Sequence, residues 1–314
     1  MGRAATIAVA ALCGVVAALL YLAAVLGSPG ALILVYLTQL PLFIAGLWLG
    51  TAAASIAGLA ATLVILAASD MLAAAVFAAL NPVPVVLLVR QAVLARQRSD
   101  GGVDWYPPGL LTGWLTGLAL AGVAASVLLL GGPAGIEAGL HQLLDRLLGE
   151  LGDPNPADRD TLVSLLAVVM PGVAAASWMA MVVVNGALAQ GLLGRFGAAW
   201  RPSPDLATLA LPLWILIALA GAAAATTIGG IARFLGINAM IVLSVPFCLA
   251  GLAVLHAAAR RLSHPAAVLI SFYVLAGLFG WPLLIIAVVG MFESWLRLRR
   301  RLTGRGSIGG NIDG

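Results

Sequence analysis

The stretch that decides the fold lies near the start of the chain, where residues 4–26 read AATIAVAALCGVVAALLYLAAVL. This run is longer than the core of a secretion signal, and after residues 27–30 the chain becomes apolar again at once. We therefore expect an uncleaved first membrane span. A bilayer core about 30 Å thick needs about 20 apolar residues in each helix. Runs of about this kind follow one another along the chain, at 4–26, 31–49, 51–69, 71–89, 110–131, 161–193, 206–227, 238–259, 266–279 and 283–296.

The composition also indicates a membrane protein. The chain has 314 residues, of which 62% are apolar and only 9% are charged. A soluble domain carries about 25% charged residues, because its surface faces water. Backbone groups in lipid must be hydrogen-bonded internally, and these runs are too continuous for the strands of a membrane barrel. The sequence predicts an all-α, polytopic transmembrane helical bundle of about 8–10 segments, forming a single integral membrane domain over residues 1–314.

The basic residues mark one side of the membrane. The chain has no lysine, its 16 basic residues are all arginines, and 13 of them gather in five groups near the ends of the apolar runs. The groups are Arg3, Arg90–Arg98, Arg195–Arg201, Arg260–Arg261 and Arg297–Arg305. Because cytoplasmic loops collect basic residues, we expect all five groups and both termini to be cytoplasmic. The number of crossings between groups must then be even, so we favour a hairpin broken at Gly280-Trp281-Pro282 over one kinked span for residues 266–296.

One long loop has the opposite character. Residues 132–160 contain six acidic residues and two arginines, a net charge of −4. Leucines recur there at steps of three and four, which predicts an amphipathic helix on the outer face, lying flat on the membrane or covering a cavity. We expect four parts along the chain. The first five membrane segments lie in residues 1–131, the acidic loop in 132–160, the remaining segments in 161–302 and a flexible tail in 303–314.

Motifs for catalysis are absent from the sequence. It has no His-Glu-x-x-His, Gly-x-Ser-x-Gly, P-loop or Cys-x-x-Cys pattern, and its three histidines are far apart. We expect no enzymatic activity, no cofactor and no metal site. The high basicity is explained by the arginines near the inner leaflet, so we expect no nucleic-acid partner.

Polar residues inside apolar runs are the candidates for a binding site. Asn81-Pro82-Val83-Pro84 interrupts the fourth run, and broken helices in transporters use freed carbonyl groups to hold ions or substrates. Trp178 and Asn185 lie seven residues apart on one helix face, and Gln190 lies near the end of the same run. The predicted binding residues are Asn81, Pro82, Pro84, Trp178, Asn185 and Gln190. The alternative is that the prolines make a simple kink and that each amide only joins neighbouring helices.

The chain resembles an uncharacterised bacterial membrane family, the YybS-like family. The resemblance covers nearly the whole chain and is strongest in residues 246–301, including Gly290-Met291-Phe292-Glu293-Ser294-Trp295. Residues 101–109, and Trp178 with Asn185, Ala189 and Gln190, also look similar. The resemblance implies a bacterial cytoplasmic (inner) membrane protein and names no chemistry.

The layout of the first six spans is loosely similar to the substrate-binding subunits of energy-coupling vitamin transporters and to the rod-shape membrane protein group. In such subunits a stripe of small residues on the first helix contacts a membrane partner. By that analogy, Ala10, Gly14 and Ala18 would bind a partner subunit; otherwise they pack within the bundle. The terminal arginines Arg297, Arg299, Arg300 and Arg301 are expected to bind anionic lipid headgroups.

Three functions remain open at this point. The first is a small-molecule transport or substrate-binding membrane subunit, with a cavity lined by Asn81. The second is a scaffold or assembly protein of the cell envelope that binds no ligand. The third is an intramembrane enzyme, for which no spacing of reactive groups gives support.

Overall fold

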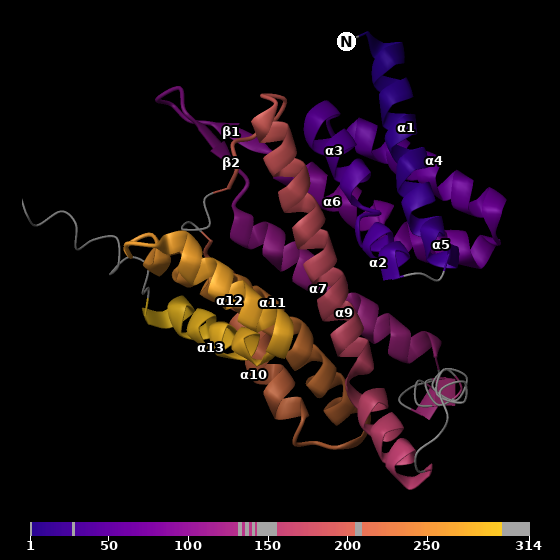
Figure 1. Cartoon of the computed structure of the whole chain (residues 1–314), viewed down its shortest axis with the longest axis vertical. Coiled ribbons are helices and arrows are strands. Elements are labelled where there is room, and N and C mark those ends of the chain that lie inside the picture. The colour runs from indigo at the N-terminus through magenta and orange to yellow at the C-terminus, as the bar shows by residue number, and fades with distance from the viewer. Residues whose placement is uncertain are drawn as a thin grey trace, which may run out of the picture. The chain divides into compact units, whose positions relative to one another are not determined.

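The structure is a computed structural model, and it describes residues 2–26, 29–130, 134–135, 138–139, 142, 156–204 and 209–296. Within these ranges it is almost entirely helical (Figure 1). The elements are α1 (Arg3–Leu22), η1 (Ala23–Leu26), α2 (Pro29–Tyr36), α3 (Leu40–Leu49), α4 (Thr51–Ala68), α5 (Met71–Leu80), α6 (Pro82–Ala92), β1 (Ala95–Gln97), β2 (Val103–Trp105), α7 (Pro108–Leu129), α9 (Pro156–Arg195), α10 (Leu213–Ala225), α11 (Gly230–Ala259), α12 (Pro265–Phe279) and α13 (Trp281–Leu296).

The helices have the length and surface of membrane spans. In the part of the chain that the structure describes, seven helices are long and apolar enough to cross a bilayer, or eight if a bent pair counts as one span. Large apolar side chains lie on their outer surfaces; Leu129, for example, is 83% exposed. Water would make so much exposed apolar surface unfavourable, whereas lipid does not. The predicted all-α polytopic bundle is confirmed.

The chain divides into two compact units. Unit 1 contains Met1–Leu115 and Trp178–Pro204, and unit 2 contains Thr116–Ser177 and Asp205–Gly314. Helices α7 and α9 therefore each contribute residues to both units. Each unit is described separately below. The assignment of residues 1–314 to one membrane domain stays a prediction.

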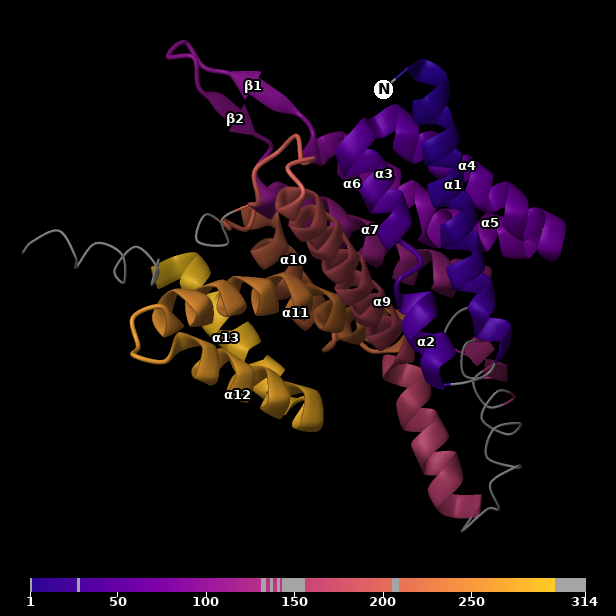
Figure 2. The same cartoon turned by 45° about the horizontal axis from the view of Figure 1, so that its top comes forward.

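In unit 1 the small-residue stripe of α1 packs against α4 (Figure 2). Ala10 and Ala18 are completely buried, and a Cβ atom at Gly14 would collide with the carbonyl oxygen of Ala57 in α4. The expectation that a partner subunit binds this stripe is therefore wrong, because α4 already covers it. The alternative, packing within the bundle, is the one that the structure shows.

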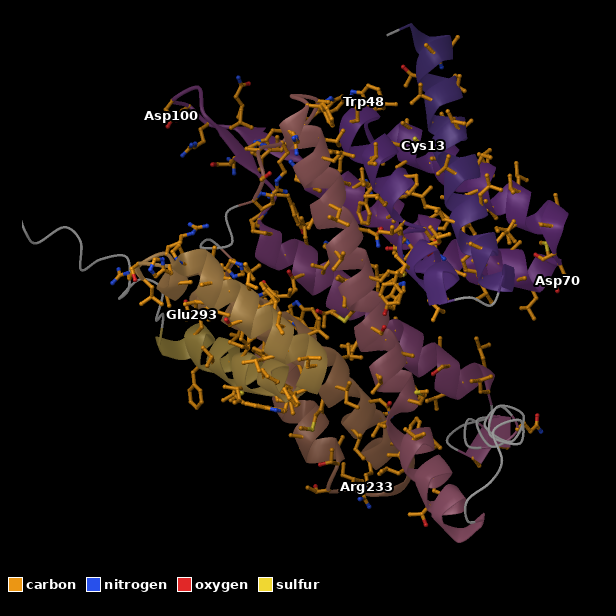
Figure 3. All side chains as sticks on the ribbon, in the orientation of Figure 1. Cys13, Trp48, Asp70, Asp100, Arg233 and Glu293 are labelled. Carbon is orange, nitrogen blue, oxygen red and sulfur yellow. The ribbon has the colours of Figure 1, made fainter. Side chains whose placement is uncertain are left out.

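The fourth predicted run begins with a well-formed cap. Asp70, labelled in Figure 3, precedes α5, and its Oδ1 accepts a hydrogen bond of 2.8 Å from the backbone N–H of Ala73. A capping carboxylate satisfies one of the free N–H groups of the first helical turn and interacts favourably with the helix dipole. Asp70 is thus a structural residue of the loop between α4 and α5.

The arginine-rich segment after α6 folds into a short hairpin that the sequence did not predict. Strands β1 and β2 pair antiparallel, with Ala95 opposite Trp105. The Nε atom of Arg98 lies 3.7 Å from Asp100 and 3.4 Å from Asp104, across the exposed end of the hairpin. Exposed ion pairs of this kind contribute little to stability, about 0–1 kcal/mol.

Unit 2 is built around α11, which packs against α10 and α13. Leu243 and Phe247 are buried together with Ile215 of α10. On the α13 side, a Cβ atom at Gly290 would collide with the carbonyl oxygen of Phe247, and one at Gly251 with that of Ile286. The two glycines therefore allow the backbones of α11 and α13 to approach closely.

The last apolar stretch folds back on itself. Helices α12 and α13 are bent by 118° at Gly280, which has a positive φ of 71° (Figure 1). Glycine tolerates this left-handed conformation without a Cβ clash. A bend of this size occurs in a broken span or in a re-entrant loop, so the predicted hairpin stays a prediction.

Two helices of unit 2 have different limits from those predicted. Helix α10 has only 13 residues, because Pro212 is its extended N-cap, with ψ at 143°. Helix α11 starts at Gly230, eight residues before the predicted position 238, and includes Arg233 near its beginning. A charged residue near a helix end lowers the local hydropathy without ending the helix. This explains why the predicted start of α11 was eight residues too late.

Two predicted features fall outside the described residues. The amphipathic outer helix was placed in residues 132–160, of which only a few positions and the start of α9 are described. The arginines predicted to bind lipid headgroups, residues 297–301, also lie outside the described ranges.

Candidate functional site

Two spans of unit 1 are interrupted, and proline explains both interruptions. The span Gly30–Leu49 is broken by a turn at residues 37–39, between α2 and α3. Pro41, at the start of α3, has no N–H to offer the Leu37 carbonyl group. The span Met71–Ala92 is broken at Asn81, between α5 and α6, where Pro82 and Pro84 follow directly.

The carbonyl group of Leu80 joins the two interruptions. In a continuous helix it would accept the N–H of residue 84, which is a proline. Instead, it accepts hydrogen bonds from Gln39 Nε2 at 3.1 Å and from the indole Nε1 of Trp178 at 2.8 Å. The freed carbonyl is thus satisfied by side chains from the other broken span and from α9.

The amide of Asn81 lies beside that carbonyl. Its Oδ1 accepts a 3.4 Å hydrogen bond from Gln39 Nε2, and its Nδ2 donates to the Phe77 carbonyl oxygen at 3.3 Å. Asn81 is 4% exposed, and Gln39 is completely buried. The amides of Asn81 and Gln39 are therefore buried in this structure, whereas the hydrogen bond between Trp178 and the Leu80 carbonyl group lies at the surface of the bundle, where Leu80 is 47% exposed.

Asn185 of α9 reaches the other side of the turn at residues 37–39. Its Nδ2 donates to the Tyr36 carbonyl oxygen at 2.6 Å and to the Met181 carbonyl oxygen at 2.8 Å. The first bond joins α9 to the end of α2, and the second stays within α9. We call the residues Thr38, Gln39, Asn81, Trp178 and Asn185, with the Leu80 carbonyl group, the polar cluster.

The cluster lies half-way along both interrupted spans. Gln39 is the tenth residue of the 20-residue span Gly30–Leu49, and Asn81 is the eleventh residue of the 22-residue span Met71–Ala92. Positions equally far from both ends of a span lie near the middle of the bilayer. Binding sites of many transporters lie at this depth, where discontinuous helices meet.

The structure brings together most of the predicted binding residues. Asn81, Pro82 and Pro84 form the break in one span, and Trp178 and Asn185 contact the two breaks from α9. Gln190 is not part of the cluster, because its Nε2 donates to the Arg201 carbonyl oxygen at 2.6 Å. Their role in binding stays a prediction.

Gln190 belongs instead to a set of hydrogen bonds at the end of α9. Arg201 is buried, and its guanidinium donates to the carbonyl oxygen of Ala92, the last residue of α6, at 3.2 Å. Burial lowers the pKa of Arg201. A cation at a helix C-terminus is favourable because it faces the unpaired carbonyl groups.

Unit 2 contains a polar contact that the sequence did not suggest. Asn238 of α11 is completely buried, donates to the Val168 carbonyl oxygen at 2.9 Å and accepts the Gly172 N–H at 2.6 Å. Within α9 the N–H of residue 172 and the carbonyl of residue 168 are i and i−4 neighbours, and Pro171 lies between them inside the helix. The Asn238 amide hydrogen-bonds to both groups from α11.

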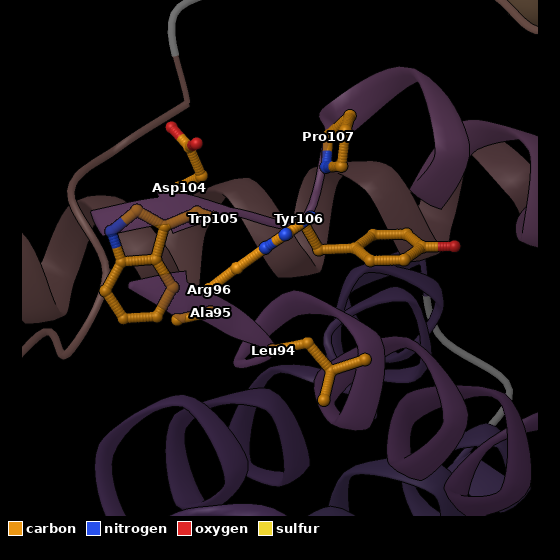
Figure 4. A pocket seen from close by; sticks show the side chains of 7 residues that line it. All are labelled: Leu94, Ala95, Arg96, Asp104, Trp105, Tyr106 and Pro107. Atoms are coloured by element: carbon orange, nitrogen blue, oxygen red, sulfur yellow. The ribbon is translucent and has the colours of Figure 1, made fainter. Parts of the chain in front are cut away.

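A surface depression of about 510 Å³ lies at the base of the hairpin (Figure 4). Its lining includes Arg96, Asp104, Trp105 and Tyr106, from the two strands and the segment that follows. Its lining carries both signs of charge and belongs to an exposed loop, so we do not assign it to the binding site.

Among the described residues, no three His, Cys, Asp or Glu side chains gather in the way that a transition-metal site requires. The polar cluster itself contains only neutral side chains. Its chemistry is that of hydrogen bonds and of oxygen atoms that can face a cation.

The fold and the sequence define the class: the chain is a multi-pass α-helical membrane protein. Residues 155–294, slightly under half of the chain, match the model of a family described as "Predicted membrane protein (DUF2232)". This match agrees with the resemblance to an uncharacterised multi-pass membrane family. The search of curated proteins and the search of solved structures each gave no match.

Proposed function

We propose that this chain is a membrane subunit that binds or transports a small polar solute at the polar cluster of unit 1. The observation that supports the proposal most is that two interrupted spans meet half-way along their length. Interrupting a span leaves backbone N–H and C=O groups without their helix partners inside the bilayer, which is unfavourable. An interrupted span therefore indicates that the freed groups serve a function, such as binding a solute. Transport proteins use such gaps to hold ions and solutes.

Thr38 and the amides of Gln39, Asn81 and Asn185 are buried in this structure, so a solute can reach them only after a conformational change. The break at Asn81, where Pro82 and Pro84 have no N–H to donate, and the turn at residues 37–39 are places where the backbone can bend without losing regular helix bonds. The hydrogen bonds that close the cluster are few, and in membranes each contributes about 0.6 kcal/mol. Opening is therefore energetically accessible.

Accessibility of position 38 tests the proposal. In a background without Cys13 and Cys248, Thr38→Cys would be compared with Ala61→Cys, a completely buried position in α4. A water-soluble methanethiosulfonate reagent is expected to label Cys at position 38 much faster, because the cluster opens to water. Equal, slow labelling at both positions would contradict a transport role.

The alternative is a scaffold protein of the cell envelope that binds no ligand. It is favoured by one observation, that the amides of Gln39, Asn185 and Asn238 all donate to carbonyl groups of other helices. Such bonds hold the helices of the bundle together and need no ligand. This alternative predicts no labelling at position 38 and a stable partner recovered by cross-linking in native membranes.

The placement in the membrane is part of the same proposal. The arginine groups favour an inner-membrane protein with both termini in the cytoplasm. The terminal arginines 297–301 would then lie near anionic headgroups, each contributing about 1 kcal/mol to membrane attraction.

A further inference from the structure

Among the residues that the structure describes, three buried side-chain oxygens have no hydrogen-bond partner: Thr38 Oγ1, Gln39 Oε1 and Asn185 Oδ1. All three belong to the polar cluster. Thr38 and Gln39 are neighbours in the turn between α2 and α3, and Asn185 bonds to Tyr36, two residues before Thr38. The three residues are at most 1% exposed.

The orientation of the two amides is fixed by their nitrogen atoms. Gln39 Nε2 faces the carbonyl oxygen of Leu80, and Asn185 Nδ2 faces the carbonyl oxygens of Tyr36 and Met181. Rotating either amide by 180° would place oxygen against oxygen and lose these bonds. Both amide oxygens must therefore point away from the carbonyl groups and need a donor or a cation.

The hydroxyl group of Thr38 behaves differently from other hydroxyl groups in the bundle. In helices, Ser and Thr usually donate to a carbonyl group one turn earlier. Thr62 does so, with its Oγ1 at 2.9 Å from the Gly58 carbonyl oxygen, and Ser244 does so toward Ile241. Thr38, at the break between α2 and α3, has no such bond.

Unpaired buried oxygen atoms in lipid are unfavourable, by about 1–3 kcal/mol each for a polar group. Two of them belong to the turn at residues 37–39 and the third to Asn185, which bonds to Tyr36 next to that turn, and together they indicate an occupant that faces oxygen atoms. Alkali cations are held by neutral oxygen ligands, and cation sites in transporters use unwound backbone with hydroxyl and amide groups. A divalent cation would call for carboxylate ligands, which the cluster does not contain.

We propose that the polar cluster binds an alkali cation, Na⁺ being the probe, through Thr38 Oγ1, Gln39 Oε1 and Asn185 Oδ1. This inference rests on the proposed function, because it names the ion that would accompany or constitute the solute. The cation joins the turn between α2 and α3 to α9, and its release frees the turn to move. Of the three ligands, sequence reasoning identified only Asn185 as a binding residue, because the site uses none of the usual His, Cys or carboxylate ligands.

The test uses the full-length protein in detergent, with Na⁺, K⁺ or N-methyl-D-glucamine as the only cation at equal ionic strength. Thermal unfolding and binding of radioactive ²²Na⁺ are both measured. The wild type is expected to unfold at a higher temperature in an alkali cation than in N-methyl-D-glucamine, and to bind ²²Na⁺ saturably. Thr38→Val is expected to lower ²²Na⁺ affinity by roughly tenfold or more and to lose the stabilisation.

Two variants control for a folding defect. Thr38→Ser keeps the hydroxyl group and should retain the response to the cation. Thr62→Val removes a hydroxyl group that is bonded within its own helix, and should also respond like the wild type. Because the Thr38 hydroxyl has no partner, Thr38→Val should unfold in N-methyl-D-glucamine no earlier than the wild type.

Equal unfolding temperatures in all three cations, with no saturable ²²Na⁺ binding, would overturn the inference and leave an ordered water as the occupant. An equal response of Thr38→Val and the wild type would overturn it too. The cation-binding test and the labelling test of the proposed function can fail independently. Fast labelling at position 38 without cation binding refutes only the cation, whereas cation binding without labelling would indicate a structural ion and refute transport.

Discussion

Replacing Asn238 by leucine should destabilise unit 2, because the side chain completes the hydrogen bonding of another helix. Leucine has nearly the shape of asparagine but can neither donate to the Val168 carbonyl group nor accept the Gly172 N–H. Both groups then lie unpaired beside Pro171 in the interior of the bundle. The side chain touches no proposed ligand site, so the effect reports on packing and hydrogen bonding alone.

The expected loss follows from the two groups left without partners. An unpaired buried backbone group costs about 1–3 kcal/mol, whereas hydrogen bonds between membrane helices average about 0.6 kcal/mol. Two such groups give a loss of about 1–6 kcal/mol in the free energy of unfolding. The lower end applies if α9 closes its own bond between Gly172 and Val168 when the amide is removed.

The free energy is measurable by reversible unfolding in mixed micelles, with increasing sodium dodecyl sulfate and far-ultraviolet circular dichroism. Ser244→Ala is the matched control in the same helix, because its hydroxyl group bonds only to Ile241 one turn earlier. Asn238→Asp, which keeps an acceptor for Gly172 but no donor for Val168, is a second comparison. If Asn238→Leu unfolds within about 0.5 kcal/mol of the wild type, the bridging role is refuted.

Three further predictions follow from the packing and the charges. Gly290→Ala should lower the free energy of unfolding by about 1–3 kcal/mol, because the added methyl group meets the Phe247 carbonyl group; an unchanged value would show that α11 and α13 are not in contact. Trp178→Phe keeps the aromatic packing but removes the N–H that bonds to Leu80, so a loss of about 0.6–1.7 kcal/mol is expected, and no loss would argue against the shared carbonyl. Reporter tags before residue 4 and after residue 305 should both report from the cytoplasm, and opposite compartments would contradict the orientation.

The spans were predictable because hydrophobicity alone determines them. The continuous runs gave most helices to within a few residues, and the break at residues 280–282 gave the fold-back between α12 and α13. The start of α11 was not predictable in this way. Arg233 and the surrounding glycines lower the local hydropathy, so Asn238 was placed at the end of a span and not two turns inside it.

The small-residue stripe on α1 shows a different limit of sequence reasoning. Ala10, Gly14 and Ala18 indicate that another helix approaches closely, but they do not say which one. The structure places α4 there, so no separate subunit is needed to explain the stripe.

The candidate site was predictable only in part. The two prolines after Asn81 indicated a break, and the spacing of Trp178 and Asn185 indicated a common face. Thr38 was not identified, because a threonine in an apolar run usually bonds to its own helix, and only the structure shows that it does not. Gln190 was grouped with the site by sequence proximity, although its partner is the loop at Arg201.

The central claim is that two interrupted spans meet at the Leu80 carbonyl group, and an experimental structure in lipid nanodiscs with Na⁺ present tests it most directly. The expected result is a break at Asn81 and a Leu80 carbonyl oxygen within hydrogen-bonding distance of both Gln39 Nε2 and Trp178 Nε1. A continuous helix through residues 71–92, with Gln39 facing lipid, would contradict the claim.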